Sequence, residues 1–240
     1  FTALTESLAH KGSDGVEELT RILNAYFGQI ISVVQEHGGD VIKFAGDALL
    51  AFWPNKSEQE LSVMTRRAIQ CALALQRSLK DFSAPGGVKL SLKVSVSAGD
   101  IRSLELGGML NRWEFVVTGK PLSEAGQAND RGQKGDVVVS QAAWNLVQES
   151  FEGTVVEEGC VRILSVTEYL DTQKRHYTPI GDEFQGQVES YIPGAVRHRL
   201  HAGQTAWLGE FRRLTIIFVN LPEMTMELPL DQAQKAVVTL

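Results

Sequence analysis

The first clear pattern along the chain is a helical repeat of apolar side chains between residues 15 and 37. Its members recur every three or four positions: Leu19, Ile22, Leu23, Tyr26, Phe27, Ile30 and Val34. This spacing places them on one face and predicts an amphipathic helix. The pair Gly38-Gly39 then acts as a stop signal. A second helix is predicted from Ser57 to Lys80, with Ser57 as its N-cap.

Two short apolar runs lie between these helices and flank the pair Gly46-Asp47. They predict a tight β-hairpin over residues 39–53, in which Gly46 supplies a backbone angle that other residues avoid. Asp47 then lies at the turn, outside the apolar layer. That layer is predicted to contain Ile42, Phe44, Leu49, Ala51 and Phe52.

The next elements follow from alternation and turn signals. Residues 88–98 alternate apolar and polar and predict one half-buried strand, residues 99–111 predict a loop, and residues 113–118 a short strand. A weak helix over 121–129, a strand over 136–140 and a short helix capped by Ser140 complete the series. This order predicts an α+β sandwich with helices on one face of a largely antiparallel sheet.

The signals fade after residue 150. Short strand-like pieces at 154–156 and 162–166 precede a polar stretch over 171–187, which we interpret as a linker. A helix is predicted over 191–200, and it leads to an apolar run at 214–221 that predicts a buried strand. We therefore divide the chain into domains at 1–150, 151–210 and 211–240. Because both ends fall inside expected elements, we expect the chain to be part of a longer protein.

Composition excludes several classes of function. The 240 residues carry a formal net charge of −6, which argues against a nucleic-acid partner because phosphate contacts need clustered Lys and Arg. No apolar run reaches the roughly 18 residues of a membrane span. Cys71 and Cys160 are too few for a disulfide framework and lack metal-ligand spacing. We expect free thiols, a reducing compartment and a cytoplasmic location.

Asp47 is the leading candidate for chemistry. A carboxylate at a hairpin tip, with Lys43 four residues earlier, suits a magnesium–phosphate site, because the metal prefers hard oxygen ligands and the phosphate a nearby cation. The alternative is an ordinary Gly-Asp turn, since both residue types are common in turns.

The string Gly-Gly-Asp-Val-Ile-Lys-Phe-Ala-Gly-Asp-Ala-Leu-Leu-Ala-Phe-Trp over residues 38–53 closely resembles the metal-binding hairpin of class III nucleotidyl cyclases. It looks most like the first catalytic half of the bicarbonate-responsive soluble adenylyl cyclases. Residues 1–6 are similar to the segment after the first metal aspartate of that family, and the resemblance extends to about residue 140. It implies a ferredoxin-like βαββαβ core. It also implies conversion of ATP to cyclic AMP and pyrophosphate by two Mg²⁺ or Mn²⁺ ions at the interface of two cyclase domains.

The resemblance assigns roles to single residues. Asp47 matches the second metal aspartate, and the first is expected shortly before Phe1. Phe1 and Thr2 match the loop whose backbone N–H groups hold the terminal phosphates. Lys93 matches a lysine that contacts the triphosphate; its alternative is a solvated strand lysine.

Departures from the family pattern are equally informative. Lys43 and Val117 match the bicarbonate pocket, but Gly126 stands where an arginine helps to hold the anion, which makes bicarbonate regulation doubtful. Lys43 alone could be an ordinary edge lysine. Ser123 and Gln127 replace the Asn and Arg of complete cyclase domains, as expected of a half that contributes metals while its partner domain contributes those two groups.

The strand expected over residues 214–221 resembles the first strand of a second cyclase domain. Asn220 stands there in place of a metal aspartate. An amide is a weaker ligand for magnesium than a carboxylate, so the second half is expected not to hold the metals.

Two other classes of function compete with the cyclase. One is a regulatory pseudocyclase that binds nucleotide or anion without turnover. The other is a diguanylate cyclase or polymerase-palm relative, which shares the core but has a Gly-Gly-Asp/Glu-Glu-Phe hairpin that is not matched here. The choice between ATP and GTP cannot be read from these residues.

Overall fold

The longest helix of the computed structural model follows the first apolar repeat. Helix α2 (Gly12–Glu36) buries Ile22, Tyr26, Ile30 and Val34, and the shorter helix α1 (Thr2–Ala9) precedes it. Gly38 adopts a φ of +82° just after the last turn, which confirms the predicted stop. The structure describes residues 2–80, 82–84, 88–157, 159–177, 179, 181–203, 215 and 227–239.

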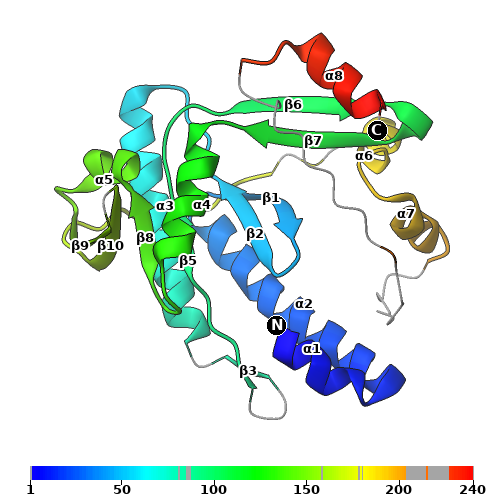
Figure 1. The fold of residues 1–240 in the computed structure, drawn as a ribbon, viewed down its shortest axis with the longest axis horizontal. Coiled ribbons are helices and arrows are strands. Elements are labelled where there is room, and N and C mark those ends of the chain that lie inside the picture. The colour runs from blue at the N-terminus through cyan, green and yellow to red at the C-terminus, as the bar shows by residue number, and fades with distance from the viewer. Residues whose placement is uncertain are drawn as a thin grey trace. The chain divides into compact units, whose positions relative to one another are not determined.

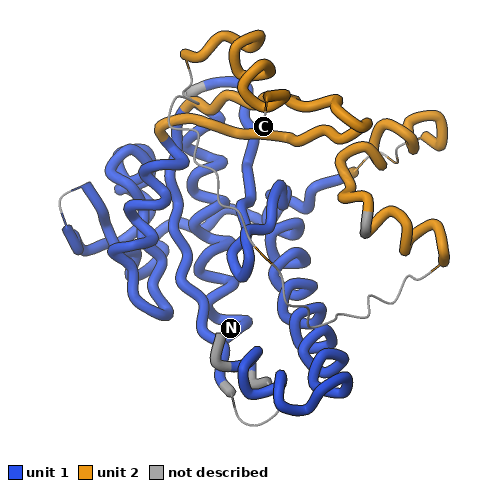
Figure 2. Tube along the Cα trace, turned by 45° about the vertical axis from the view of Figure 1, so that its right-hand side comes forward, with its two compact units in different colours: residues 1–99, 121–176 blue, residues 100–120, 177–240 orange. Residues whose placement is uncertain are grey.

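The chain forms two compact units, shown in Figure 2. Unit 1 comprises residues 1–99 and 121–176, and unit 2 comprises residues 100–120 and 177–240. The segment 100–120 therefore joins a unit whose other residues lie much later in the sequence.

Unit 1 contains the two predicted helices and the predicted hairpin between them (Figure 1). The hairpin consists of β1 (Asp40–Ala45) and β2 (Ala48–Phe52), and the second helix is α3 (Glu58–Leu79). Ser57 caps α3 as predicted, because its Oγ accepts a hydrogen bond from the Glu60 N–H at 3.3 Å. Side chains of α1, α2 and α3 share one core, which includes Leu4, Leu8, Cys71, Leu75 and Leu79.

A four-stranded sheet forms the second part of unit 1. Its order is β5 (Val94–Val96), β8 (Val137–Ser140), β10 (Cys160–Val166), β9 (Phe151–Glu157), with β5 parallel to β8 and the other pairs antiparallel. Helix α5 (Gln141–Val147) follows β8, and the Ser140 Oγ accepts from the Ala143 N–H at 3.2 Å. The cap predicted at Ser140 is therefore confirmed.

The sheet is covered on both faces, so the prediction of helices on one face is wrong. Ile69 of α3 packs with Val137 and Val139, whereas Ala128 of α4 (Lys120–Arg131) packs with Val138. Successive residues of a strand point to opposite faces, so α3 and α4 lie on opposite sides of β8. This double cover explains why all four residues of β8 are buried.

The predicted continuous strand over 88–98 is broken in the structure. Its first residues form β4 (Val88–Lys89), which pairs with β3 (Ser83–Ala84), and regular pairing resumes only at β5. The Leu92 carbonyl between them accepts from the Gly135 N–H at 2.8 Å and from the Gln76 side chain at 3.1 Å. Those contacts take the backbone out of the ladder.

Unit 2 is built around a hairpin of β6 (Arg102–Gly107) and β7 (Trp113–Thr118), joined through a short 3₁₀ turn at Met109–Asn111. The loop predicted over 99–111 is therefore wrong over β6, while the strand predicted over 113–118 is confirmed. Leu104 pairs with Val116, and Leu104 and Leu106 are buried against Ala233 of α8 (Leu230–Thr239).

The remaining elements of unit 2 are short. They are a 3₁₀ turn at Asp182–Phe184, α6 (Gln185–Glu189) and α7 (Gly194–His201). The predicted linker over 171–187 is thus helical at its end, and α7 overlaps the helix predicted over 191–200. Apart from Thr215, the strand predicted over 214–221 lies outside the described residues, and so does Asn220.

Candidate active site

The hairpin that carries Asp47 has the predicted geometry. Strands β1 and β2 pair antiparallel from Asp40 opposite Phe52 to Ala45 opposite Ala48, which leaves Gly46 and Asp47 as the two turn residues. Gly46 has a φ of +64°, and the φ of Asp47 is not positive, which is the pattern of a type II′ turn. The turn directs the exposed Asp47 side chain away from the apolar layer.

The apolar layer of the hairpin agrees with the prediction only at Leu49 and Ala51, which pack against the core shared with α2. The register shifts between Val41 and Lys43, and Val41 takes part in this core in place of the predicted Ile42 and Phe52. The Phe44 ring is 50% exposed. Phe44 pairs with Leu49 only one pair before the turn, and the Phe27 ring of α2 meets it edge-on at 5.3 Å. The core ends before the tip, so this ring contacts the helix and remains half exposed.

Asp47 lies within electrostatic reach of α2. Burial raises the pKa of the Tyr26 phenol above its usual value of 10.0, and the negative charge of Asp47 raises this pKa further. Asp47 makes no hydrogen bond or ion pair with any residue that the structure describes. Its carboxylate oxygens are therefore available to a cation at this exposed tip.

The base of the hairpin is fixed by Trp53, a residue that the sequence analysis did not single out. Its indole Nε1 donates to the His37 carbonyl at 2.9 Å. The same ring lies over Gly39, where an added Cβ would come within 2.5 Å of a ring carbon. Gly39 therefore provides space for the indole, a use that its place in a helix stop signal did not reveal.

Lys93 has a structural partner. Its exposed side chain donates from Nζ to the Asn129 carbonyl at 2.7 Å, close to the C-terminal end of α4. Lysine there satisfies a terminal helix carbonyl and complements the helix dipole. No contact joins Lys93 to Asp47 among the described residues, so its role toward a triphosphate remains a prediction.

The other predicted site residues are distributed over both units. Thr2 is the first residue of α1, as expected of a helix start, and Phe1 lies outside the described residues. Lys43 is exposed on β1 in unit 1, whereas Val117 belongs to β7 in unit 2. The structure therefore places the two residues of the predicted bicarbonate pocket in different units.

Helix α4 presents the positions that depart from the family pattern. Ser123, Gly126 and Gln127 are all exposed on it. A Cβ added at Gly126 would meet no atom within 4 Å. Within the described parts of the chain, no group of three or more His, Cys, Asp or Glu residues could hold a metal, so Asp47 needs a further ligand from elsewhere.

Residues 1–174 match the family model of the adenylate and guanylate cyclase catalytic domain. The chain belongs to this family. It is 28% identical over 251 residues to adenylate cyclase type 10 of Homo sapiens, covering 92% of this chain and 16% of the human protein. It is 25% identical over 173 residues to the terminal-differentiation specific adenylate cyclase of Dictyostelium discoideum, covering 70% of this chain and 7% of that protein. The chain thus spans about one sixth of the length of the human relative.

Solved cyclase structures share the fold. The guanylyl cyclase Cya2 matches with a TM-score of 0.54 at 21% identity, covering 66% of this chain and 86% of Cya2. The adenylyl cyclase CyaB from P. aeruginosa matches with a TM-score of 0.52 at 17% identity, covering 65% and 85%. The predicted α+β class III cyclase fold is therefore confirmed. In the described residues, no helix combines the length and apolar character needed to cross a membrane.

Proposed function

We propose that this chain is the metal-bearing half of a tandem adenylyl cyclase, which converts ATP to cyclic AMP and pyrophosphate. The observation that carries the proposal is Asp47, an exposed carboxylate at the tip of a type II′ hairpin with no hydrogen-bond partner among the described residues. The similarity to adenylate cyclase type 10 over 92% of the chain supports the same reaction.

In this reaction the ribose 3′-oxygen attacks the α-phosphorus. A new O3′–P bond forms, the bond from the α-phosphorus to the bridging oxygen breaks, pyrophosphate leaves and the 3′-hydroxyl proton is lost. Two Mg²⁺ or Mn²⁺ ions would supply activation of the nucleophile and neutralisation of the leaving charge. Asp47 fits a hard cation because its carboxylate is exposed and forms no hydrogen bond or ion pair within the described part of the chain, and a second carboxylate outside the described residues would complete the site.

The other residues of this half would bind and orient the triphosphate. The backbone N–H of Thr2 stands at the start of α1, where free amides and the helix dipole attract phosphate oxygens, and Phe1 would precede it in the same loop. Lys93 would exchange its contact with the Asn129 carbonyl for a phosphate oxygen. Both roles bind substrate, and neither supplies the groups that stabilise the reacting phosphate.

Those groups would come from a second cyclase domain of the same chain, beginning near residue 211. Ser123 and Gln127 lie exposed on α4. Their hydroxyl and amide groups carry no positive charge, so they cannot replace an arginine that stabilises the transition-state phosphate. We further propose a cytoplasmic location, because Cys71 and Cys160 are both free and buried.

The test is Asp47→Asn in the full-length protein. We expect cyclic AMP formation to fall at least about 1,000-fold, since a lost metal carboxylate forfeits several kcal/mol of transition-state stabilisation. The matched control is Asp130→Asn, which removes another exposed carboxylate, on α4, and should leave the activity unchanged. Near-normal activity of Asp47→Asn, with an unchanged dependence on the metal-ion concentration, would contradict the proposal.

A regulatory pseudocyclase is the second candidate, and it is favoured by the lack of a complete acidic metal cluster among the described residues. The two functions differ in turnover. Binding of ATP by the full-length protein with no cyclic AMP formed, at saturating Mg²⁺ or Mn²⁺, would favour the pseudocyclase.

A further inference from the structure

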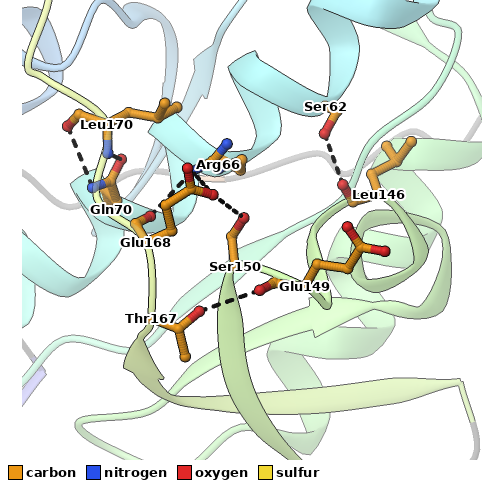
Figure 3. A network of polar contacts seen from close by, with 9 residues as sticks. All are labelled: Ser62, Arg66, Gln70, Leu146, Glu149, Ser150, Thr167, Glu168 and Leu170. Atoms are coloured by element: carbon orange, nitrogen blue, oxygen red, sulfur yellow. Dashed lines mark hydrogen bonds and ion pairs between the residues drawn. The ribbon is translucent and has the colours of Figure 1, made fainter.

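A segment after the last strand of unit 1 runs across α3 toward the base of the Asp47 hairpin. We name residues 167–175 the strap. Figure 3 shows its first part, where Thr167 and Glu168 leave β10 beside Ser150. The Thr167 N–H donates to the Ser150 carbonyl at 3.0 Å, and the Ser150 Oγ donates to the Glu168 carboxylate at 3.3 Å. The start of the strap is therefore anchored to the sheet side of the unit.

Three side chains of α3 hold the strap between Glu168 and Gln173. Arg66 contacts Glu168 twice through Nη2, at 3.1 Å to the carbonyl and 3.0 Å to the carboxylate. The buried Gln70 amide both donates to the Leu170 carbonyl at 3.5 Å and accepts from the Leu170 N–H at 3.4 Å (Figure 3). Arg67 donates to the Gln173 side chain. The strap is thus tied to the helix along its length.

The end of the strap reaches the hairpin. The Arg175 N–H donates to the carbonyl of Gln35, in the last turn of α2, at 2.9 Å. The Arg175 Nη2 lies 3.5 Å from the carboxylate of Asp40, the first residue of β1. Gly38 lies between Gln35 and Asp40 in the sequence, and the strap passes close to it. A Cβ added at Gly38 would come within 2.9 Å of the Gln173 carbonyl oxygen.

We propose that Arg175 is a positioning residue for Asp47, acting through Asp40 and the paired strands of the hairpin. Trp53 fixes the end of β2, and Arg175 fixes the start of β1, so both strands are held at the base. Asp47 lies seven residues beyond Asp40, about 20 Å away along a strand. A tilt of about 3° at the base would therefore move the carboxylate by about 1 Å, a displacement large enough to matter for catalysis.

The strap also ends at the boundary between the units, because unit 1 stops at His176 and the chain then enters unit 2. This inference rests on the proposed cyclase function for its kinetic consequence, but its structural claim concerns unit 1 alone.

The experiment compares Arg175→Ala with Arg162→Ala in the full-length protein. Arg162 is the matched control, because its side chain is similarly exposed and forms an ion pair at 3.8 Å with Asp136, just before β8. At saturating ATP, Arg175→Ala should raise the Mg²⁺ concentration for half-maximal activity about two- to fivefold, the range expected from one partly exposed ion pair. Arg162→Ala should not change it, and Arg175→Lys should restore most of the wild-type value.

Asp40→Asn should reproduce the effect, and the Asp40→Asn/Arg175→Ala pair should be no worse than either single variant. An unchanged Mg²⁺ dependence in Arg175→Ala, with activity reduced only in proportion to the folded fraction, would overturn the positioning role.

Hydrogen exchange separates this inference from the proposed function. The amides of residues 41–45 and 48–52 should exchange faster in Arg175→Ala than in Arg162→Ala, whether or not the protein makes cyclic AMP. Equal exchange rates in the two variants would refute the positioning role of Arg175, even if the cyclase activity is established. Faster exchange in Arg175→Ala, in a protein without cyclase activity, would support the positioning role of Arg175 and reject the proposed function.

Discussion

Gly126 is the residue at which a single side chain could change the response of the protein to a small anion. Gly126 is exposed and a Cβ at this position would meet no atom within 4 Å, so a side chain can begin here without a clash. A guanidinium holds an oxyanion through two parallel hydrogen bonds, whereas a lysine such as Lys43 offers a point charge for which water competes.

We therefore expect weak or absent bicarbonate stimulation of the wild-type full-length enzyme, and we expect Gly126→Arg to introduce or strengthen it. The measurement is a bicarbonate titration of cyclic AMP formation at fixed pH and ionic strength. Gly28→Arg is the control, since Gly28 is another exposed helical glycine with open space around it. Robust stimulation of wild type that Lys43→Ala abolishes would show that another residue replaces the missing arginine.

At the scale of single elements, two helices depend on serine caps in different environments. Ser57 caps α3 at an exposed end, whereas Ser140 is only 2% exposed and its Oγ also lies 2.9 Å from the Ser97 Oγ. Removal of a buried hydroxyl leaves its partners unsatisfied as well as uncapping the helix.

Ser57→Ala should lower the free energy of unfolding by about 1 kcal/mol, and Ser140→Ala by about 2 kcal/mol. Urea unfolding monitored by circular dichroism measures both, with Ser91→Ala, an exposed serine between β4 and β5, as a control that should change little. Equal losses of unfolding free energy in Ser57→Ala and Ser140→Ala would contradict the expectation that removing the buried hydroxyl is the more costly change.

At the scale of the whole molecule, we propose that this chain and a second cyclase domain contribute different groups to one active site. The 240-residue chain alone would then lack part of that site. Ser123 has a hydroxyl where complete cyclase domains have an Asn, and Gln127 has an uncharged amide where they have an Arg. Asp47 is the metal carboxylate that we assign in this chain, and the described residues hold no cluster of three or more possible metal ligands. We expect the purified chain to form no cyclic AMP, and activity to appear only in the longer protein. Cyclic AMP formation by the chain itself, free of contaminating cyclase, would show that the division of labour is wrong.

Elements whose cause is local could be predicted from the amino-acid order alone. The apolar repeat of α2, the serine caps of α3 and α5 and the turn at Gly46-Asp47 all depend on residues within a few positions of one another. Local periodicity and capping are physical properties of a short stretch of chain. The exposed position of Asp47 followed from the same local rules.

Tertiary structure decided the features that join distant residues. Strand β6 lies in a glycine-flanked stretch that resembled a loop, and it exists as a strand because it pairs with β7 and buries Leu104 and Leu106 against α8. Likewise, only packing decided that α3 and α4 cover opposite faces of β8.

The contacts of the strap with α3 and the hairpin also join residues that are distant in the sequence. Arg66 and Glu168 are 102 positions apart in the sequence, and the strap begins in a region whose residues carry little periodic signal. Its last residues, including Arg175, fall within a polar stretch that predicts a linker. Side-chain hydrogen bonds across such separations leave no pattern in the amino-acid order, because each depends on where the fold brings the two residues together.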